Sequence, residues 1–525
     1  MLENPKVTLP LQLNENVFEK TDVSLSYNLI RAEQVRQHEL AAAASLNCGS
    51  YALMQRAGAA ALHCIQAYYP LAQKILVLVG SGNNGGDGYI VASLARQQGL
   101  NVIVASADPE RLVKGDALQA RALWLHDEGM IFDSNEPDFN EFDLVVDALL
   151  GTGLQGVIRP PMMSIIEKIN RCKVPVLSLD VPSGMHSDTG AALPLAVEAQ
   201  RTVTFVAIKP GLVTGVGKHY CGQLILADLA IAKPFHAMAK SAAQLISWST
   251  LARLSQRQYH ANKGNFGRLV CFGGNQGMAG AICLTATAAL RSGAGLVKVF
   301  CHEHSQALVA NSQREIMLNT ATGIAAIKAA LDWSTCVVLG PGLGTDAWSH
   351  SIFEHVLAYL SHTAKPVIID ADGLNLLAKK WQTNQRIKLP ACVLTPHPGE
   401  AARLLGLTVQ EIEQDRYAAS QAISARYGAV CVLKGAGTII SQATDDGACL
   451  VCADGNPGMA TAGMGDVLSG VIGAMLGQGM SAVDAASYGV CLHANAGDRV
   501  ASDYGQRGMI ASDLFQPLRA ILNYR

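Results

Sequence analysis

Short runs rich in Val, Ile and Leu alternate with segments of helical periodicity along most of this chain. This alternation predicts parallel sheets covered by helices, and therefore an α/β fold in both halves. The first half is expected to be Rossmann-like, with two extra helices at 31–44 and 51–68 ahead of its sheet. The expected strands are 74–79, 101–106, 143–147, 174–180, 202–207 and 223–227, followed by 268–272, 295–300, 336–339, 366–370, 391–395 and 429–433.

The length of 525 residues exceeds what one hydrophobic core usually serves, so at least two domains are expected. The stretch 233–250 holds small residues and no clear strand, which is typical of a linker. The first 25 residues lack the basic start and apolar run of a signal peptide and are expected to form a loose arm. The predicted division is an arm at 1–25, a domain at 26–232, a linker at 233–250 and a domain at 251–525.

The composition favours a protein that acts on small molecules. Half of the residues are hydrophobic, 16% are charged, and the net charge is -2, so nothing global favours binding to nucleic acid or a membrane. The 13 cysteines are scattered through apolar runs, as expected of reduced core thiols in a cytoplasmic protein. Cys449 and Cys452 form a CxxC pair, but the Leu-Val between them suits a strand better than zinc or redox chemistry.

Two glycine-rich segments, 82–88 and 463–466, each carry an aspartate and could each bind phosphate at the start of a helix. The first lies in a stretch, 80–85, that fits G-x-G-x-x-G after a strand, a pattern typical of dinucleotide binding. A plain dinucleotide site does not need the amides and carboxylate of Asn83, Asn84 and Asp87. These side chains therefore indicate chemistry or an ion at this turn.

Asp147 and Asp180 end two further strands of the first domain. Because ligands of open α/β sheets bind at the carboxyl ends of strands, both are expected to meet the first glycine-rich turn. A single strand-end aspartate more often caps the following helix, but three converging polar turns favour function.

The segments 83–88, 151–153 and 179–184, with 32–36 and 53–58 ahead of them, resemble the NAD(P)H-hydrate epimerases. The resemblance implies conversion between R and S hydrates of the nicotinamide ring, and a potassium ion near Asn84, Asp147 and Ser183. Asp180 is the expected acid/base residue, because a bond at one carbon must break and reform within reach of a proton acceptor. The residues implied to line the hydrate site are Asn83, Asn84, Gly85, Gly86, Asp87, Gly151, Thr152, Gly153, Leu154, Gln155, Gly156, Val157 and Asp180.

The second glycine-rich turn opens an apolar helix, so Gly463 and Gly465 could form an anion hole for a transferring phosphoryl group. Asp466 is expected to accept a hydroxyl proton there, ionised near neutrality because an ordinary aspartate has a pKa of about 3.9. The motif is short, and an ordinary helix cap has the same form.

With the segments 340–344, 370–375, 394–400, 434–438 and 456–460 ahead of it, this turn resembles the ADP-dependent NAD(P)H-hydrate dehydratases of the ribokinase-like superfamily. The resemblance implies that Mg2+ bridges the nucleotide phosphates. Asp466 is implied to contact the hydrate as the base, together with Ala281, Gly344 and His397, although His397 could instead be a loop histidine bonded to backbone. Contacts to ADP are implied for Lys434, Gly435, Ala436, Gly437, Thr438 and Gly465.

Together the two resemblances predict a bifunctional metabolite-repair enzyme acting on NADHX and NADPHX, the hydrates of NADH and NADPH. The first domain would equilibrate R and S forms, and the second would dehydrate the S form while converting ADP to AMP and phosphate. A homo-oligomer is expected. Two alternatives stay open: an ATP-dependent small-molecule kinase in the second domain, and a non-catalytic NAD-sensing or protein-binding module in the first.

Overall fold

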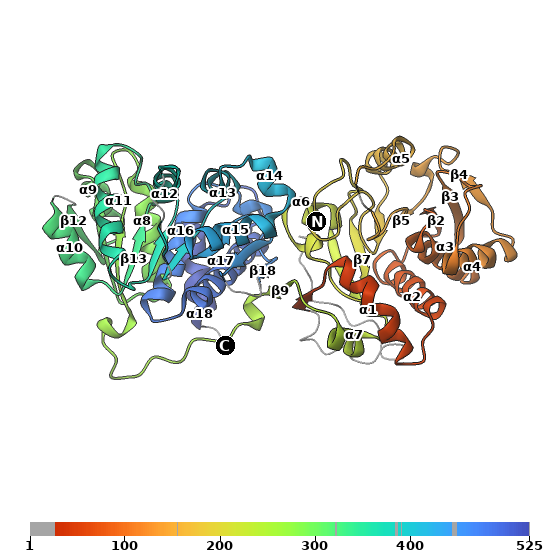
Figure 1. The fold of residues 1–525 in the computed structure, drawn as a ribbon, viewed down its shortest axis with the longest axis horizontal. Coiled ribbons are helices and arrows are strands. Elements are labelled where there is room, and N and C mark those ends of the chain that lie inside the picture. The colour runs from red at the N-terminus through yellow and green to blue at the C-terminus, as the bar shows by residue number, and fades with distance from the viewer. Residues whose placement is uncertain are drawn as a thin grey trace. The chain divides into compact units, whose positions relative to one another are not determined.

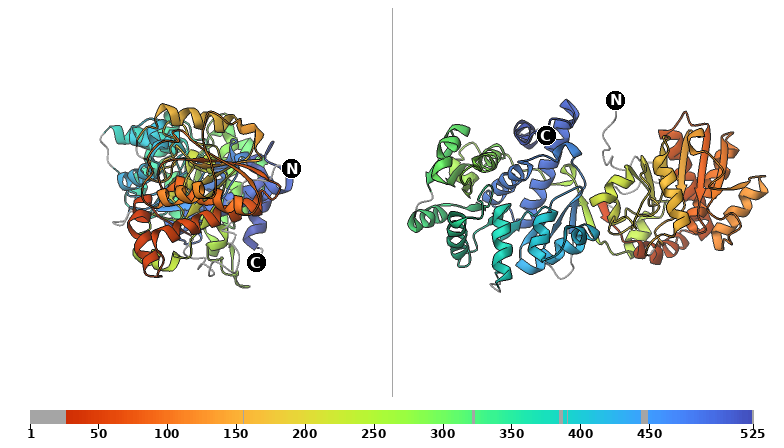
Figure 2. Two further views of the ribbon diagram at one scale, coloured as in Figure 1. Left: turned by 90° about the vertical axis from the view of Figure 1, so that its right-hand side faces the viewer. Right: turned by 90° about the horizontal axis from the view of Figure 1, so that it is seen from above.

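The computed structural model describes residues 27–154, 156–320, 323–383, 387–389, 391–443 and 449–523, so the predicted arm lies outside the described residues. The chain divides into two compact units, Met1–Gln244 and Leu245–Arg525 (Figure 1). Two further views show strands lying between helices in both units (Figure 2). The predicted α/β class is confirmed for both halves.

The first unit alternates strands and helices as expected, and the predicted strands at 74–79, 101–106 and 223–227 agree with the structure to the residue. The short strand β4 was not predicted. The elements are β1 Asn28–Leu29, α1 Ala32–Ala44, α2 Ser50–Tyr68, β2 Lys74–Val79, α3 Asn83–Gln97, β3 Asn101–Ser106, α4 Gly115–His126, β4 Ile131–Asp133, β5 Leu144–Ala148, α5 Pro160–Arg171, β6 Val176–Leu179, β7 Arg201–Phe205, α6 Gly215–Cys221, β8 Gln223–Ala227 and α7 Ala232–Met238.

A parallel sheet in the order β4-β3-β2-β5-β6-β7-β8 forms the centre of this unit. Alternate residues of β2 point to opposite faces of the sheet. Val77 packs in the core with α2, α3 and α4, whereas Leu76 and Leu78 pack in the core with α5. The order reverses between β2 and β5, so the chain leaves β2 toward α3 on one face of the sheet and leaves β5 toward α5 on the other. Such a switch point is where ligands of open α/β sheets bind.

The second unit also alternates strands with helices. The strands β12 and β17 were not predicted. Its elements are β10 Arg268–Phe272, α8 Ala279–Arg291, β11 Leu296–Cys301, α9 Gln306–Ser312, β12 Ile316–Thr320, α10 Ile324–Trp333, β13 Cys336–Leu339, α11 Ala347–Leu360, β14 Val367–Ile369, α12 Asp372–Gln382, β15 Cys392–Leu394, α13 Pro398–Leu405, α14 Val409–Gln414, α15 Arg416–Tyr427, β16 Val430–Leu433, β17 Thr438–Ser441, β18 Cys449–Cys452, α16 Met464–Gly477, α17 Ala482–Tyr504 and α18 Phe515–Asn523.

Its strands run in the order β18-β17-β16-β15-β14-β13-β10-β11-β12, parallel from β16 to β12 and antiparallel in the hairpin that β17 and β18 add. Helices α8, α16 and α17 cover one face, and the apolar side chains of α16 lie in one core with Cys271 and Val338 of the sheet. Cys449 and Cys452 lie on β18, which confirms the strand interpretation of the CxxC pair. All 13 cysteines are free thiols.

The stretch 233–250 is not the strand-free linker that its composition indicated. It holds most of α7, the strand β9 (Ala243–Ile246) and a short 3-10 turn. In β9, Ala243 and Gln244 pair with β1, and Ile246 is buried in the core of the second unit. The strand was missed because only two large apolar residues mark it. No helix within the described ranges is long and apolar enough to cross a membrane.

Candidate active sites

The first site is built where α3 begins, after β2. The residues 83–88, expected to form a turn, are instead the first turns of α3, with Gly82 as its N-cap at a φ of -98°. The glycines are needed for close packing rather than for an unusual φ. A Cβ on Gly85 would lie 2.0 Å from the carbonyl oxygen of Gly80, and one on Gly86 would lie 2.6 Å from Met54 Cε. The helix therefore starts close to the sheet, with Asn83 and Asn84 in its first turn.

Asn84 and Asp147 do converge at the switch point, as predicted. The Nδ2 of Asn84 donates to the carbonyl oxygen of Leu150 at 2.9 Å, while its Oδ1 is buried without a partner. Asp147, on β5, is fully buried and accepts from the hydroxyl of Ser183 at 2.5 Å and from that of Ser178 at 2.8 Å. The same Ser183 hydroxyl accepts from the amide of Leu150 at 2.8 Å.

Burial raises the pKa of Asp147, and the hydrogen bonds from Ser183 and Ser178 counteract part of that rise. The backbone amides of Ser183 and Leu149 also donate to this carboxylate. With so many donors, Asp147 is not a simple helix cap; it joins the ends of β5 and β6.

Asp180 follows β6 in a left-handed conformation, with a φ of 63°. A non-glycine residue at such a φ costs about 1–3 kcal/mol and commonly marks a functional site. Its Oδ1 accepts from Lys209 Nζ at 2.5 Å and, more weakly, from the hydroxyl of Thr204 at 3.4 Å and the amide of Phe205 at 3.3 Å. Lys209, which has 1% of its side chain exposed, was not predicted.

Two further carboxyl groups face this ion pair. Burial raises the pKa of Asp87 on α3 well above its ordinary value, and the negative charges of Asp180 and Glu39 add to that rise. Burial also raises the pKa of Glu39 on α1, with a further contribution from Asp180. The site therefore holds several acidic groups around one buried ammonium, an arrangement suited to proton transfer.

The other predicted residues of the first site lie around this edge. Gly151 packs against Asn84, since a Cβ added to it would lie 3.1 Å from that side chain, and the carbonyl of Thr152 accepts from Arg36 at 2.9 Å. Leu154 packs on the core beside α5, whereas Val157 is 75% exposed. The structure brings Gly153 and Gly156 into the same loop, and Gln155 lies outside the described residues.

The second site is built at the start of α16. Gly463 is its N-cap, with a φ of 87° that favours glycine, and Asp466 lies in its first turn. A Cβ on Gly465 would lie 3.2 Å from Lys434 Nζ, so the glycine leaves room for the ammonium directly beside the helix N-terminus. Backbone amides and a lysine therefore lie side by side at the helix start, which favours a bound anion.

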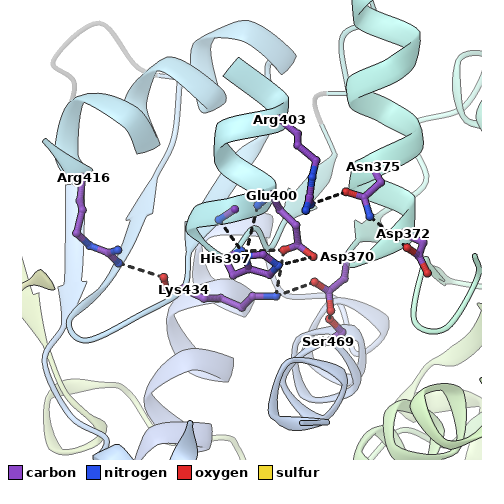
Figure 3. Close-up of polar contacts among 10 residues, drawn as sticks. Asp370, Asp372, Asn375, His397, Glu400, Arg403, Arg416, Lys434 and Ser469 are labelled. Atoms are coloured by element: carbon purple, nitrogen blue, oxygen red, sulfur yellow. Dashed lines mark hydrogen bonds and ion pairs between the residues drawn. The ribbon is translucent and has the colours of Figure 1, made fainter. Parts of the chain in front are cut away.

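Lys434 is fixed by buried carboxylates (Figure 3). Its Nζ donates to Asp370 Oδ1 at 2.9 Å and lies 3.7 Å from Glu400 Oε2, while the hydroxyl of Ser469 donates to Asp370 Oδ2 at 2.7 Å. Burial alone would raise the pKa of Asp370, but Lys434 and Ser469 outweigh it and the pKa is lowered. Asp370 is therefore a charged anchor for the lysine rather than a turn former.

The pKa of Asp466 is raised strongly by its surroundings. Burial and the negative charge of Asp370 raise its pKa to about 7, against the opposing effect of Lys434. The expectation of an ordinary aspartate was wrong, because it could not include charges from other elements. No described residue hydrogen-bonds this carboxylate, so both of its oxygens are available to a ligand.

His397 bonds backbone amides, as the loop-histidine alternative predicted, and it also lies beside Glu400. Its Nδ1 accepts from the amides of Gly399 and Glu400 at 3.0 and 3.4 Å, so the ring caps α13. Its Nε2, which lies 3.4 Å from Glu400 Oε1, is left to carry the proton. Burial and the nearby Lys434 lower the pKa of His397, whose half-exposed ring lies at the edge of the site.

Ala281 lies in the first turn of α8, and Gly344 lies in the loop after β13. The amide of Gly344 donates to Asp372 Oδ2 at 2.8 Å, and a Cβ on Gly342 would lie 3.1 Å from that of Ala281. Asp372 also accepts from Asn375, whose own Oδ1 accepts from Arg403 (Figure 3). Hydrogen bonds thus connect the loop of Gly344 to α12 and α13.

The predicted nucleotide segment is a turn between β16 and β17. Gly435 and Gly437 have φ values of 145° and 64°, and Thr438 begins β17. The buried Arg416 holds the base of this turn by donating to the carbonyl oxygens of Leu433 and Lys434 (Figure 3). Ala436, between the two glycines, completes the turn.

Sequence reasoning missed the roles of Lys209, Glu400, Arg416 and Ser469, and it gave Asp370 no role beyond its place in the segment 370–375. A signal existed for Lys209, because it is the one charged residue in the apolar run 202–213. A lone lysine in such a run needs a buried partner.

Comparison with known proteins agrees with this architecture. The family model for NAD(P)H-hydrate dehydratases matches residues 269–519, and that of the YjeF-related protein N-terminus matches residues 50–211. The bifunctional NAD(P)H-hydrate repair enzyme Nnr of Escherichia coli (strain K12) is 41% identical over 516 residues, 97% of each chain. The enzyme of the same name from Coxiella burnetii is 41% identical over 496 residues, 94% of this chain and 99% of that one.

Among solved structures, the ADP/ATP-dependent NAD(P)H-hydrate dehydratase from Bacillus subtilis, co-crystallised with ATP and Mg2+, is 28% identical with a TM-score of 0.45. The match covers 51% of this chain and 93% of that one.

Two α/β units, one with acidic groups at a Rossmann-like switch point and one with a carboxylate at an anion-binding helix start, define a two-site enzyme. The chain belongs to the bifunctional NAD(P)H-hydrate repair enzymes. The predicted family, the Rossmann-like and ribokinase-like fold classes, and the epimerase and dehydratase activities are confirmed.

Proposed function

We propose that the first unit equilibrates the R and S hydrates of NADH and NADPH at Asp180, and that the second dehydrates the S form at Asp466 with ADP as co-substrate. The observation that carries the second assignment is the position of Asp466. It lies in the first turn of α16, and the Lys434 ammonium lies beside the start of the same helix. Its pKa of about 7 suits a base that works near neutral pH.

The proposed dehydration has two steps. Asp466 takes the proton of the ring hydroxyl as that oxygen attacks the terminal phosphorus of ADP, and AMP departs. The phosphate ester then loses phosphate, which leaves far more readily than hydroxide. The neighbouring ring carbon releases a proton to solvent, and the ring double bond of NAD(P)H is restored. Amides at the start of α16 and the Lys434 ammonium lie where the charge on the phosphoryl oxygens would grow.

The ligand contacts implied by the family resemblance are proposed for this chain, and the geometry of the helix start supports them. ADP is assigned to Lys434, Gly435, Ala436, Gly437, Thr438 and Gly465, and the hydrate to Ala281, Gly344, His397 and Asp466. Magnesium would supply charge neutralisation on the nucleotide phosphates. The nearby carboxylates of Asp370 and Glu400 are already engaged with Lys434, so the nucleotide would provide most of the ligands.

The first unit is assigned the hydrate contacts 83–87 and 151–157 and a potassium ion at Asn84, Asp147 and Ser183. The residues present fit such an ion: Asn84 Oδ1 is a buried oxygen without a partner, and carboxylate and hydroxyl oxygens lie in the same cluster. A hard monovalent cation prefers oxygen ligands of this kind. When bound, the ion would neutralise negative charge beside the hydrate.

We assign epimerisation to residues 26–232 and dehydration to residues 251–525, ranges that contain the two matched segments. The free thiols of all 13 cysteines support a cytoplasmic location. The homo-oligomer stays a prediction.

The decisive experiment gives the full-length enzyme a mixture of R and S hydrates with ADP and Mg2+ and follows the absorbance of reduced nicotinamide. Complete recovery is expected, because the first unit replenishes the S form as the second consumes it. Recovery that stops at the S fraction would show that the first unit does not epimerise the hydrates. A stable phosphorylated product formed from ATP would instead identify a small-molecule kinase. Exchange between purified epimers without ADP excludes a non-catalytic first unit.

A further inference from the structure

Lys209 has no assigned role in the epimerisation and dehydration proposed above. It lies in the loop after β7, directly before Pro210, and its side chain reaches back to the carboxyl end of β6. Its ammonium has three acceptors: Asp180 Oδ1 at 2.5 Å, the hydroxyl of Thr204 at 3.0 Å and the carbonyl oxygen of Phe205 at 2.8 Å.

Three acceptors use all three N–H donors of a lysine. With 1% of its side chain exposed, Lys209 has neither a spare donor nor the room to contact a hydrate directly. A charge so completely paired and buried is costly to remove from water, and its strongest partner is the proposed catalytic carboxylate.

The contacts on Asp180 are one-sided. Lys209, Thr204 and the amide of Phe205 all bond Oδ1, and no described residue bonds Oδ2. The side chain of Asp180 is 16% exposed, and its left-handed backbone keeps the carboxylate at the carboxyl edge of the sheet. One oxygen is therefore anchored, and the other is available to a ligand.

We propose, on the basis of the function assigned above, that Lys209 is a positioning residue for epimerisation. It holds Oδ1 so that Oδ2 of Asp180 exchanges the proton with the hydrate. Epimerisation is an isomerisation, so the proton that Oδ2 accepts is returned to the product and no co-reactant is consumed.

The charged groups around the pair set its response to pH. Asp87 faces it from α3, and Glu39 and Arg36 face it from α1. The Lys209 ammonium lowers the raised pKa values of Asp87 and Glu39, and Arg36 is the further cation beside Glu39. The loss of Lys209 should therefore raise the pKa values of both carboxyl groups further and move the pH dependence of epimer exchange to higher pH.

The test measures epimer exchange of the full-length enzyme without ADP, across pH, with R and S hydrates separated by chromatography. For Lys209→Met we expect kcat at neutral pH to fall ~100-fold, with KM changed less than threefold and the pH of half-maximal exchange raised. The matched control is the exposed Lys233→Met, which should exchange like the wild type. An unchanged pH profile, or a loss confined to KM, would overturn the positioning role.

A milder variant guards against misfolding of Lys209→Met. Thr204→Val removes one acceptor of the ammonium and one donor to Oδ1 without changing any charge, and should lower kcat ~5-fold with no shift in pH profile. A kcat equal to wild type in this folded variant would count against the proposal. The proposed function itself is tested separately. Epimer exchange that persists in Asp180→Ala would show that Asp180 is not the base, whatever the result for Lys209.

Discussion

Each unit of this enzyme pairs a buried lysine with an aspartate, but the lysine holds a different partner in each. In the first unit, Lys209 bonds the proposed base Asp180 itself. In the second, Lys434 bonds Asp370, a strand-end anchor, and Asp466 receives no hydrogen bond from a described residue. Direct pairing fixes one oxygen of a carboxylate, whereas an indirect partner leaves both oxygens available and lets negative neighbours raise the pKa.

The largest effect that tests this comparison is the loss of either base. Asp466→Ala should lower ADP-dependent dehydration by about 10³-fold and leave epimer exchange intact, and Asp180→Ala should do the reverse, because each carboxylate transfers the only proton of its step. Both rates are measured on the same preparation of each variant. If either folded variant loses both activities, the two sites are not independent.

The next effect concerns the indirect lysine. Lys434→Met should lower dehydration ~100-fold by removing positive charge at the phosphoryl position. Dehydration by the wild type should rise with pH through about 7, since Asp466 must be ionised to accept a proton. Because Lys434 is the group that lowers the pKa of Asp466, the variant should need a higher pH to reach its half-maximal rate.

A pH-rate profile of single-turnover dehydration measures both quantities. The exposed Lys379→Met, on α12, is the matched control and should keep the wild-type profile. A variant whose rate falls while its profile stays fixed would show that Lys434 does not set the ionisation of Asp466.

The difference in charge balance also predicts a difference in stability. The pKa of Asp466 in the folded chain, about 7, lies above the value of about 3.9 for an unfolded aspartate, so folding favours its protonated form. Stability from that form is present at low pH and is lost as the pH rises toward 7. Asp466→Asn should therefore stabilise the second unit by ~2–4 kcal/mol above pH 7 and by nearly nothing at about pH 4.

Calorimetric unfolding of the full-length variant at the two pH values measures this gain. A gain of equal size at both values would show that the side-chain charge is not its source.

The sequence contained most of the fold because its strands are continuous apolar runs, as in 101–106 and 268–272, and its helices are periodic, as in 51–68. Strands without that pattern were missed, such as β9 and the hairpin strand β17. The glycine-rich motifs located both sites. The pKa of Asp466 could not be foreseen, because Asp370 and Glu400 reach it from segments 96 and 66 residues earlier in the chain.

The smallest effect distinguishes the two glycine-rich helix starts. Gly463→Ala should cost ~2 kcal/mol, since Gly463 has a φ of 87° and a Cβ there would lie 2.5 Å from Leu284 Cδ1. Gly82→Ala should change stability by less than ~0.5 kcal/mol, because its φ of -98° suits alanine and no atom lies within 4 Å of the added Cβ. The poorer N-cap that alanine provides and the lower entropy of the unfolded chain nearly offset each other at position 82. Urea unfolding of the two variants compares them directly, and equal losses would mean that backbone conformation is not what distinguishes the two helix starts.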